Sequence, residues 1–163
     1  MVIYLNGSIN SGKTTVAKLL VRRIPQTIHI EVDDLRHFAE CLSLEDAIPF
    51  CVEDAITLTR RWVERGFNVV VSWPISEPHH RRFVRSLDGT GVPVYTFTLS
   101  PPLAVALRDR GGRQLTERER SRIAQLYETG IHTPSFGMVI DNSDQSPEET
   151  VEEIATAVRP TSY

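Results

Sequence analysis

The sequence is poor in cysteine, has no excess of basic charge and contains no long hydrophobic run. Its two cysteines, Cys41 and Cys51, have neither the CxxC spacing nor the neighbouring histidine pair of zinc sites, and we expect both to be buried thiols. The net charge of -3 and the pI of about 6.0 disfavour a nucleic-acid partner, although a local basic patch is compatible with one. No apolar stretch approaches the ~20 residues that span a bilayer, and no signal peptide precedes Gly7. We therefore expect a cytoplasmic protein without a membrane partner.

Short apolar runs alternate with helical stretches along the whole chain. This alternation is typical of α/β proteins, in which helices cover both faces of a parallel sheet. No interior stretch resembles a linker, so we expect a single domain over residues 1–163. The predicted strands are Val2–Asn6, Ile28–Val32, Asn68–Trp73, Val92–Leu99 and Met138–Ile140. The predicted helices are Lys13–Ile24, Leu35–Cys41, Leu44–Arg65, Pro78–Leu87, Leu103–Arg110, Glu117–Glu128 and Pro147–Val158.

A glycine-rich loop of the pattern GxxxxGK[ST] follows the first predicted strand and opens the first predicted helix. Gly7 and Gly12 permit backbone angles that a side chain would forbid, so successive amides can turn towards a phosphate. Lys13 adds positive charge, and Thr14 offers the hydroxyl that commonly ligates Mg²⁺. The loop therefore predicts ATP and Mg²⁺ as cofactors. The expected nucleotide-binding residues in it are Gly7, Ser8, Ile9, Asn10, Ser11, Gly12, Lys13, Thr14 and Thr15.

Two carboxylates, Asp33 and Asp34, follow the second predicted strand at the edge where open α/β sheets bind ligands. A carboxylate there can accept the proton of a substrate hydroxyl that attacks the γ-phosphate, and we assign this catalytic role to Asp33. Asp34 and Arg36 are expected to contact the substrate, Arg36 through its planar set of donors. The alternative is that Asp33 or Asp34 caps a helix that begins near Leu35.

An arginine-rich segment, approximately residues 108–116, lies between two predicted helices and is expected to act as a lid. Phosphoryl transfer moves negative charge across the γ-phosphate oxygens, so an arginine brought over the site stabilises that charge. Arg113 is the first candidate for this catalytic role and Arg110 the second. Arg108 is a candidate to lie against the adenine ring. A solvated loop without a role in the reaction is the alternative.

The third predicted strand ends at Trp73, on the edge that faces the expected site. Trp73 is therefore a candidate substrate-binding residue, with simple packing as the alternative. Other residues that fall in the expected acceptor pocket are His37, Phe38, Phe50, Glu53 and Pro74.

These motifs resemble those of the small P-loop kinases of the shikimate kinase and nucleoside monophosphate kinase type, most closely the chloramphenicol phosphotransferase-like group. The resemblance covers nearly the whole chain and rests on Leu5-Asn6-Gly7, on Val32-Asp33 and on the arginines of residues 108–113. It implies a P-loop NTPase fold with a five-stranded parallel sheet in the order 2-3-1-4-5, helices on both faces and an arginine-rich lid. It also implies that Asp33 is the base and Arg113 the lid arginine.

The chain departs from this family at the end of the third predicted strand, where relatives often carry an aspartate that binds magnesium through water. Ser72 stands there instead, and Ser72 or Asp33 is expected to compensate. A second resemblance, carried by Asp33-Asp34-Leu35-Arg36, is to the 5'-hydroxyl polynucleotide kinases, in which an Asp and an Arg three residues later share the acceptor.

The sequence therefore predicts an ATP-dependent kinase that transfers the γ-phosphate to a hydroxyl of a small molecule, whether antibiotic-like, sugar-like or another metabolite. One alternative is a 5'-hydroxyl kinase for nucleosides or oligonucleotides. Another is a nucleotide-binding sensor with little catalysis. The acceptor, the nucleotide preference and the oligomeric state stay open at this point.

Overall fold

A five-stranded parallel sheet forms the centre of the computed structural model, which describes residues 1–109 and 114–158. The strands lie in the order β2-β3-β1-β4-β5 and are joined by parallel pairings. This order confirms the fold class predicted from the sequence and its family resemblance. The strands are β1 (Val2–Gly7), β2 (Thr27–Glu31), β3 (Asn68–Ser72), β4 (Val94–Leu99) and β5 (Met138–Ile140).

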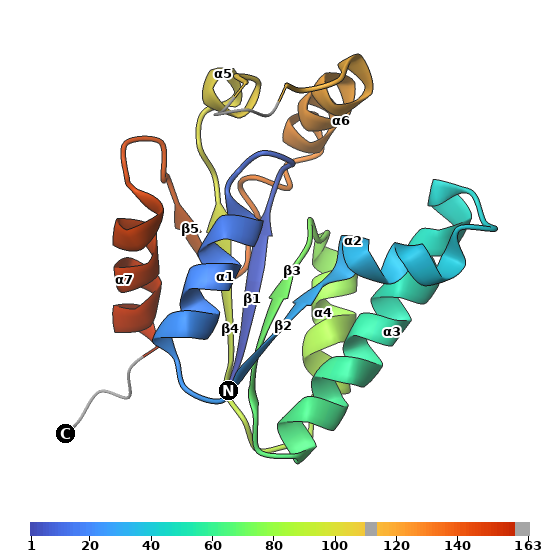
Figure 1. Ribbon diagram of the computed structural model, residues 1–163, viewed down its shortest axis with the longest axis vertical. Coiled ribbons are helices and arrows are strands. Elements are labelled where there is room, and N and C mark those ends of the chain that lie inside the picture. The colour runs from blue at the N-terminus through green and yellow to red at the C-terminus, as the bar shows by residue number, and fades with distance from the viewer. Residues whose placement is uncertain (110–113, 159–163) are drawn as a thin grey trace.

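Helices cover both faces of this sheet. Figure 1 shows α1 and α7 on one side of it and α3 and α4 on the other, while α5 and α6 lie beyond one end of the strands. None of the helices in residues 1–109 and 114–158 is long and apolar enough to cross a bilayer. The helices are α1 (Lys13–Arg23), α2 (Val32–Leu35), the 3-10 helix η1 (Arg36–Ala39), α3 (Leu44–Glu64), α4 (Glu77–Ser86), α5 (Leu103–Ala106), α6 (Glu117–Glu128) and α7 (Pro147–Ala157).

The two faces of the sheet have separate apolar cores. In β1, Val2 and Tyr4 pack in the core that includes Phe83 of α4, whereas Ile3 and Leu5 pack in the core on the other face, which α1 and α7 complete. Successive side chains of a strand point to opposite faces, so a strand buried on both faces must be apolar at nearly every position. The short continuous apolar runs of the sequence are therefore explained by strands that are buried on both faces.

Local sequence signals set several helix ends. Thr116 with Glu119 and Ser146 with Glu149 form capping boxes at the starts of α6 and α7. Each box satisfies backbone amides that the first helical turn would otherwise leave unpaired. Gly66 follows α3 with a φ of 84°, a left-handed conformation that glycine adopts without strain.

The connection between β2 and α3 differs from the sequence prediction. The helix expected to begin at Leu35 begins at Val32, directly after β2, and continues as η1. Asp33 and Asp34 occupy its first turn, where negative charge interacts favourably with the unpaired amides of a helix start. Cys41 lies beyond η1 and is exposed, so its predicted burial is wrong, whereas Cys51 is buried as expected.

The carboxyl ends of the parallel strands bring the predicted site residues to one edge of the sheet. The loop after β1, the start of α2 and the residue after β3 all leave the sheet at this edge. In open parallel sheets this edge is where ligands bind. In Figure 1 it is the end of the strands nearest to α5 and α6.

Candidate active site at the carboxyl edge of the sheet

The glycine loop has a backbone that excludes side chains at its first position. Gly7 has a φ of 137°, and a Cβ added there would lie 2.4 Å from the carbonyl oxygen of Leu99 and 2.8 Å from Oγ of Ser11. Gly12 has a φ of 98° and immediately precedes α1. Both glycines therefore serve the purpose inferred from the motif, because they allow the chain to turn tightly into the helix amino end.

Lys13 lies across the inside of this loop. Its side chain is buried, with an exposed fraction of 9%, and Nζ donates a hydrogen bond of 2.7 Å to the carbonyl oxygen of Ser8. A buried ammonium group beside the inward-turned loop is a strong attraction for a phosphate. Thr15, the last predicted residue of the loop set, is exposed in the first turn of α1.

Two buried polar atoms beside the loop have no hydrogen-bond partner in the described part of the chain. They are Oγ of Ser11 and Oδ1 of Asn142. The other end of the Asn142 amide donates to the carbonyl oxygen of Ser11 at 3.0 Å. Buried polar groups without partners are uncommon in native proteins and are often completed by a ligand. These two orphaned atoms, together with the buried ammonium, fit a polar ligand such as a nucleotide.

A carboxylate that the sequence analysis left without a role lies beside the predicted magnesium ligand. The hydroxyl of Thr14 donates to Oε2 of Glu31 at 2.7 Å. Glu31 ends β2 and pairs in register with Ser72 at the end of β3. Ser72 in turn is 2.7 Å from Nε2 of His29. Thr14 and Glu31 are therefore the residues that could hold a magnesium ion, and Glu31 at the end of the neighbouring strand could take the place of the carboxylate that is absent at Ser72.

The surroundings of Glu31 oppose its ionisation. Burial raises the pKa of this carboxyl above its ordinary value, against the hydrogen bonds from Thr14 and Ser72 and the positive charge of Lys13. Desolvation of a carboxylate without a full counter-charge has this effect. A bound cation would reverse it. The sequence signal that could have identified Glu31 is its place at the end of the strand expected beside the Ser72 strand, but the register that sets Glu31 opposite Ser72 required the structure.

Asp33 lies between the loop and a cavity. Its Oδ1 accepts a hydrogen bond of 3.2 Å from Nε1 of Trp73, and both residues line a cavity of about 420 Å³ that also touches Ile9 of the glycine loop. The helix that carries Asp33 has Glu31 at its N-cap position and no side-chain capping bond. The alternative that Asp33 or Asp34 caps a helix starting near Leu35 is therefore wrong.

Only some of the residues predicted to contact the substrate line a cavity or recess in the structure. Arg36 lines a second recess of about 540 Å³, which Asp33 also borders. Asp34 is exposed and is absent from the described linings of both hollows. Of the other residues expected in the acceptor pocket, His37 and Pro74 line one or the other hollow. The rest do not, since Phe38 and Phe50 are exposed to 86% and 58% and Glu53 pairs with Arg82.

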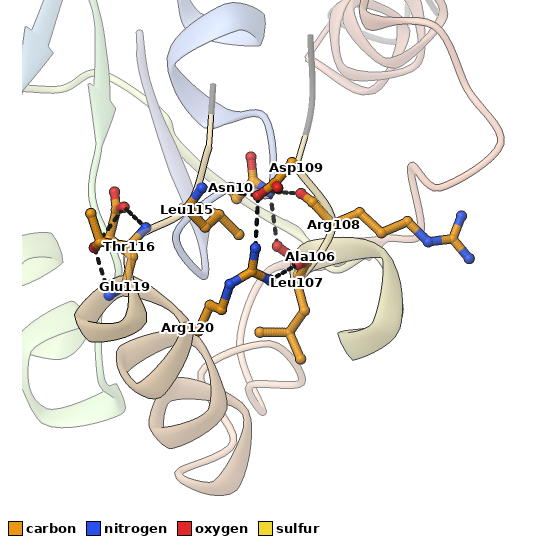
Figure 2. Close-up of polar contacts among 9 residues, drawn as sticks. All are labelled: Asn10, Ala106, Leu107, Arg108, Asp109, Leu115, Thr116, Glu119 and Arg120. Carbon is orange, nitrogen blue, oxygen red and sulfur yellow. Dashed lines mark hydrogen bonds and ion pairs between the residues drawn. The ribbon is translucent and has the colours of Figure 1, made fainter. Parts of the chain in front are cut away.

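The loop is tied by side chains to the base of the predicted lid. Nδ2 of Asn10 donates to the carbonyl oxygens of Ala106 at 2.8 Å and of Arg108 at 2.9 Å. Arg120 of α6 donates to the carbonyl oxygen of Leu107 at 2.5 Å and to Oδ1 of Asp109 at 2.8 Å. Figure 2 shows these contacts as one cluster. The positions of Asn10 and Arg120 indicate that the loop, α5 and α6 are held as a unit.

Of the three arginines expected to act in the predicted lid, Arg108 lies in the described part of the chain. In Figure 2 the guanidinium of Arg108 points away from the cluster. Arg110 and Arg113 lie outside the described residues, so their predicted roles stay predictions. The helix expected to reach Arg110 ends at Ala106, where Asn10 binds the carbonyl oxygen that a further helical turn would use.

A buried asparagine connects the loop to the cavity wall. The side chain of Asn6 donates to Oγ1 of Thr98 and to the carbonyl oxygen of Ile131, both at 3.0 Å, and accepts from the amide of Ile75 at 2.9 Å. Three hydrogen bonds from one fully buried amide fix the distances between β1, β4 and the two loops. Asn6 thereby positions Ile131, which lines the cavity, relative to the phosphate loop.

Several solved structures have a similar fold over nearly the whole chain. The structure is similar to that of a tunicamycin resistance protein from Deinococcus radiodurans (26% identity, 98% of this chain and 96% of that chain, TM-score 0.63). It is also similar to a gluconokinase from Sinorhizobium meliloti 1021 (21%, 93% and 87%, 0.67) and to shikimate kinase from Aquifex aeolicus VF5 (22%, 97% and 96%, 0.63).

No protein with a curated description matches the sequence significantly. A family model described as an AAA domain matches residues 2–126, which is most of the chain and includes the glycine loop, Glu31 and Asp33. The resemblance to small P-loop kinases inferred from the motifs is confirmed by these comparisons. The chain therefore belongs to the AAA domain family of P-loop proteins and has the fold of the small P-loop kinases.

Proposed function

We propose that the protein is an ATP- and magnesium-dependent kinase that transfers the γ-phosphate to a hydroxyl group of a small molecule. The observation that carries the proposal is the position of Asp33. Its carboxylate borders the cavity that Ile9 of the phosphate loop also lines, so a hydroxyl bound in that cavity would lie between the carboxylate and the phosphates. A kinase needs this arrangement, because the base and the γ-phosphate must reach the same oxygen atom.

Asp33 would orient the acceptor hydroxyl and accept its proton. The hydrogen bond from Nε1 of Trp73 to Oδ1 of Asp33 fixes the orientation of the carboxylate towards the cavity. A positioned carboxylate of this kind contributes roughly 10²- to 10⁴-fold to a transfer reaction. The neighbouring arginine, Arg36, borders the adjoining recess and would bind a polar or anionic part of the acceptor.

The phosphate loop would hold the nucleotide. Its amides and the amino end of α1 carry partial positive charge, and Lys13 would exchange its hydrogen bond to Ser8 for phosphate oxygens. Thr14 and Glu31 would hold magnesium, which when bound neutralises charge on the β- and γ-phosphates. Arg113, and after it Arg110, are the proposed arginines for the charge that develops during transfer.

The names of the structural neighbours support the kinase class. Two of them are a gluconokinase and a shikimate kinase, and both names denote phosphate transfer to small molecules. The neighbour with the highest identity of the three is called a tunicamycin resistance protein. These names differ in the acceptor, so they support phosphoryl transfer without selecting a substrate.

A 5'-hydroxyl nucleoside or oligonucleotide kinase is the second candidate function. It is favoured by one observation, namely that Asp33 and Arg36 border the same recess. It is disfavoured by the net charge of -3, because a track for a nucleic-acid strand is normally basic and lined with stacking aromatic residues. A 5'-hydroxyl oligonucleotide therefore belongs in the acceptor panel.

The experiment that tests the proposal offers labelled ATP and magnesium with a panel of hydroxylated small molecules, and compares Asp33→Asn with wild type. We expect the variant to lower kcat at least about 100-fold while its affinity for ATP stays unchanged. Asp34→Asn is the matched control, since this exposed neighbour lies outside the described cavity linings. Equal activity of Asp33→Asn and wild type would reject Asp33 as the base. ATP binding without transfer to any acceptor would indicate a nucleotide sensor instead.

A further inference from the structure

The two hollows that meet at Asp33 differ in chemistry. The cavity of about 420 Å³ has mainly apolar walls, contributed by the glycine loop, α3 and α6, with Ile9, Ile48 and Leu126 as representative side chains. The recess of about 540 Å³ has four ionisable residues, namely Asp33, Arg36, His37 and Glu40. Asp33 and Leu44 belong to both linings. An acceptor with its hydroxyl at Asp33 therefore has an apolar compartment on one side and a polar one on the other.

Several polar side chains of the mainly apolar cavity already have a partner in the wall. Trp73 bonds Asp33, Oγ of Ser76 is 3.1 Å from Nδ1 of His79, and Arg122 donates to Gln125 at 2.5 Å. A sugar or sugar acid carries a hydroxyl on nearly every carbon, and each would need its own partner in the wall once water is removed. The apolar side chains that form most of the wall cannot supply these partners, which leaves the polar groups of Asp33, Ser76, His79, Arg122, Gln125 and Thr129.

The dimensions of the cavity match one small molecule. A volume of about 420 Å³ lies within the range of roughly 300–1,000 Å³ found for small-ligand sites. Trp73 adds a flat aromatic wall next to Asp33, which favours a planar or branched apolar group held beside the reacting hydroxyl. Asn6 fixes the position of Ile131, another lining residue, through a hydrogen bond to its carbonyl oxygen.

From this division we infer that the acceptor is an alcohol with a largely apolar body, aromatic or branched aliphatic, that occupies the Trp73 cavity. Its hydroxyl lies at Asp33, and its polar substituents extend into the recess bordered by Arg36. The inference rests on the proposed kinase function and narrows its substrate class, because it excludes polyhydroxylated sugars and sugar acids as the preferred acceptors.

Binding can be measured without catalysis because the chain has two tryptophans, of which Trp73 lines the cavity. In a Trp62→Phe protein, Trp73 is the sole tryptophan, and its fluorescence reports occupancy of the cavity. We expect 3-phenylpropan-1-ol and cyclohexylmethanol to change this fluorescence with dissociation constants at least about 10-fold lower than those of glucose and gluconate. Equal or stronger binding of the sugars, or no response to any alcohol, would overturn the inference.

Transfer from labelled ATP provides the second measurement. We expect Ile48→Asn and Ile131→Asn, which place an amide on the apolar wall, to raise the KM for an apolar alcohol about 10-fold and to leave the KM for ATP unchanged. The unchanged KM for ATP shows that the variants are folded. Leu103→Asn is the control, because Leu103 is a half-exposed residue of α5 outside both described linings. An unaltered KM for the alcohol in both cavity variants would contradict the inference.

The outcomes separate this inference from the function on which it rests. Phosphorylation of glucose or gluconate in preference to the apolar alcohols overturns the inference and leaves the kinase proposal intact. Binding of ATP without transfer to any alcohol or sugar overturns both. Transfer to the apolar alcohols that is lost in Asp33→Asn and weakened in the cavity variants supports both.

Discussion

The nucleotide side and the acceptor side of the site are built in different ways. On the nucleotide side the essential geometry belongs to the backbone, with Gly7 and Lys13 buried against the sheet. On the acceptor side it belongs to side chains of α2, η1, α3 and α6, several of them half-exposed. The nucleotide half therefore follows the backbone rules of the P-loop motif, whereas the acceptor half can change its ligand by exchange of a few side chains. Three substitutions test this distinction.

The largest effect should follow from Gly7→Ala, which attacks the backbone half directly. The new Cβ would approach the carbonyl oxygen of Leu99 to 2.4 Å at a φ of 137°. Strain and overlap together should lower the free energy of unfolding by about 3 kcal/mol or more and abolish ATP binding. Urea denaturation and nucleotide titration measure the two effects.

The matched control for this variant is Gly89→Ala. Gly89 also has a left-handed backbone, with a φ of 81°, but an added Cβ meets nothing within 4 Å. Gly89→Ala should therefore lose only the stability that a left-handed backbone costs an alanine, about 1–2 kcal/mol, and it should bind ATP normally. If both variants lost the same stability, the proposed steric role of the Leu99 carbonyl group would be wrong.

An intermediate effect is expected from Trp73→Phe on the acceptor side. Phenylalanine keeps the apolar wall but removes the hydrogen bond to Oδ1 of Asp33. This hydrogen bond, which orients the Asp33 carboxylate, should contribute about 1 kcal/mol to the transition state. Its loss should therefore lower kcat roughly 5-fold and change the KM for the acceptor little. Steady-state kinetics distinguish this from a packing role, which would raise KM instead. Trp62→Phe, near the C-terminal end of α3 and outside both described linings, should leave both constants unchanged.

The smallest effect concerns Glu31, at the boundary of the two halves. Because burial raises its pKa in the folded state above 4.5, ionisation at neutral pH costs the folded protein stability. This cost disappears as the pH falls through the folded pKa towards 4.5. Ligand-free Glu31→Gln should thus be more stable than wild type at pH 7.5 by less than about 1 kcal/mol, and the difference should vanish near pH 4.5.

With magnesium and ATP bound, wild type should be more stable than Glu31→Gln, since the glutamine offers no negative charge to the metal ion. Thermal unfolding at several pH values, with and without both ligands, measures this crossover. A ligand-free variant that is less stable than wild type at pH 7.5 would show that the hydrogen bond from Thr14 outweighs the desolvation of the carboxylate. An exposed carboxylate, Glu45, provides the control through Glu45→Gln.

The sequence predicted those parts of the molecule that depend on local rules. The sheet, its helices and the capping boxes at Thr116 and Ser146 follow from periodicity and capping chemistry, and the glycine loop follows from conformational freedom at Gly7. The role of Glu31 could not be predicted in this way. Its position depends on the register of β2 against β3, which places Glu31 opposite Ser72 and which the predicted strand order did not fix.

The acceptor side was less predictable for a related reason. Trp73 and Asp33 were identified from their places at strand ends, and the structure brings them together at 3.2 Å. Phe38 and Phe50 were expected in the pocket but are exposed. Phe38 lies in the 3-10 helix η1, where the sequence predicted an α-helix over Leu35–Cys41, so its side chain does not take the position expected for it. Phe50 lies in α3, which begins at Leu44 as predicted, so the assignment of a helix does not by itself show which of its side chains reach the cavity.

The short bridge at the base of the arginine segment has a consequence for how this protein can diversify. The amide of Leu115 donates to Oδ1 of Asp109 at 2.9 Å, and Arg120 donates to the same oxygen at 2.8 Å, so Asp109 and Leu115 are held close together. Closing a longer excursion between two such points adds only about 0.6 kcal/mol for each doubling of its length. Extra residues between Asp109 and Leu115 should thus cost little stability, while Asn10 keeps its bonds to the carbonyl oxygens of Ala106 and Arg108.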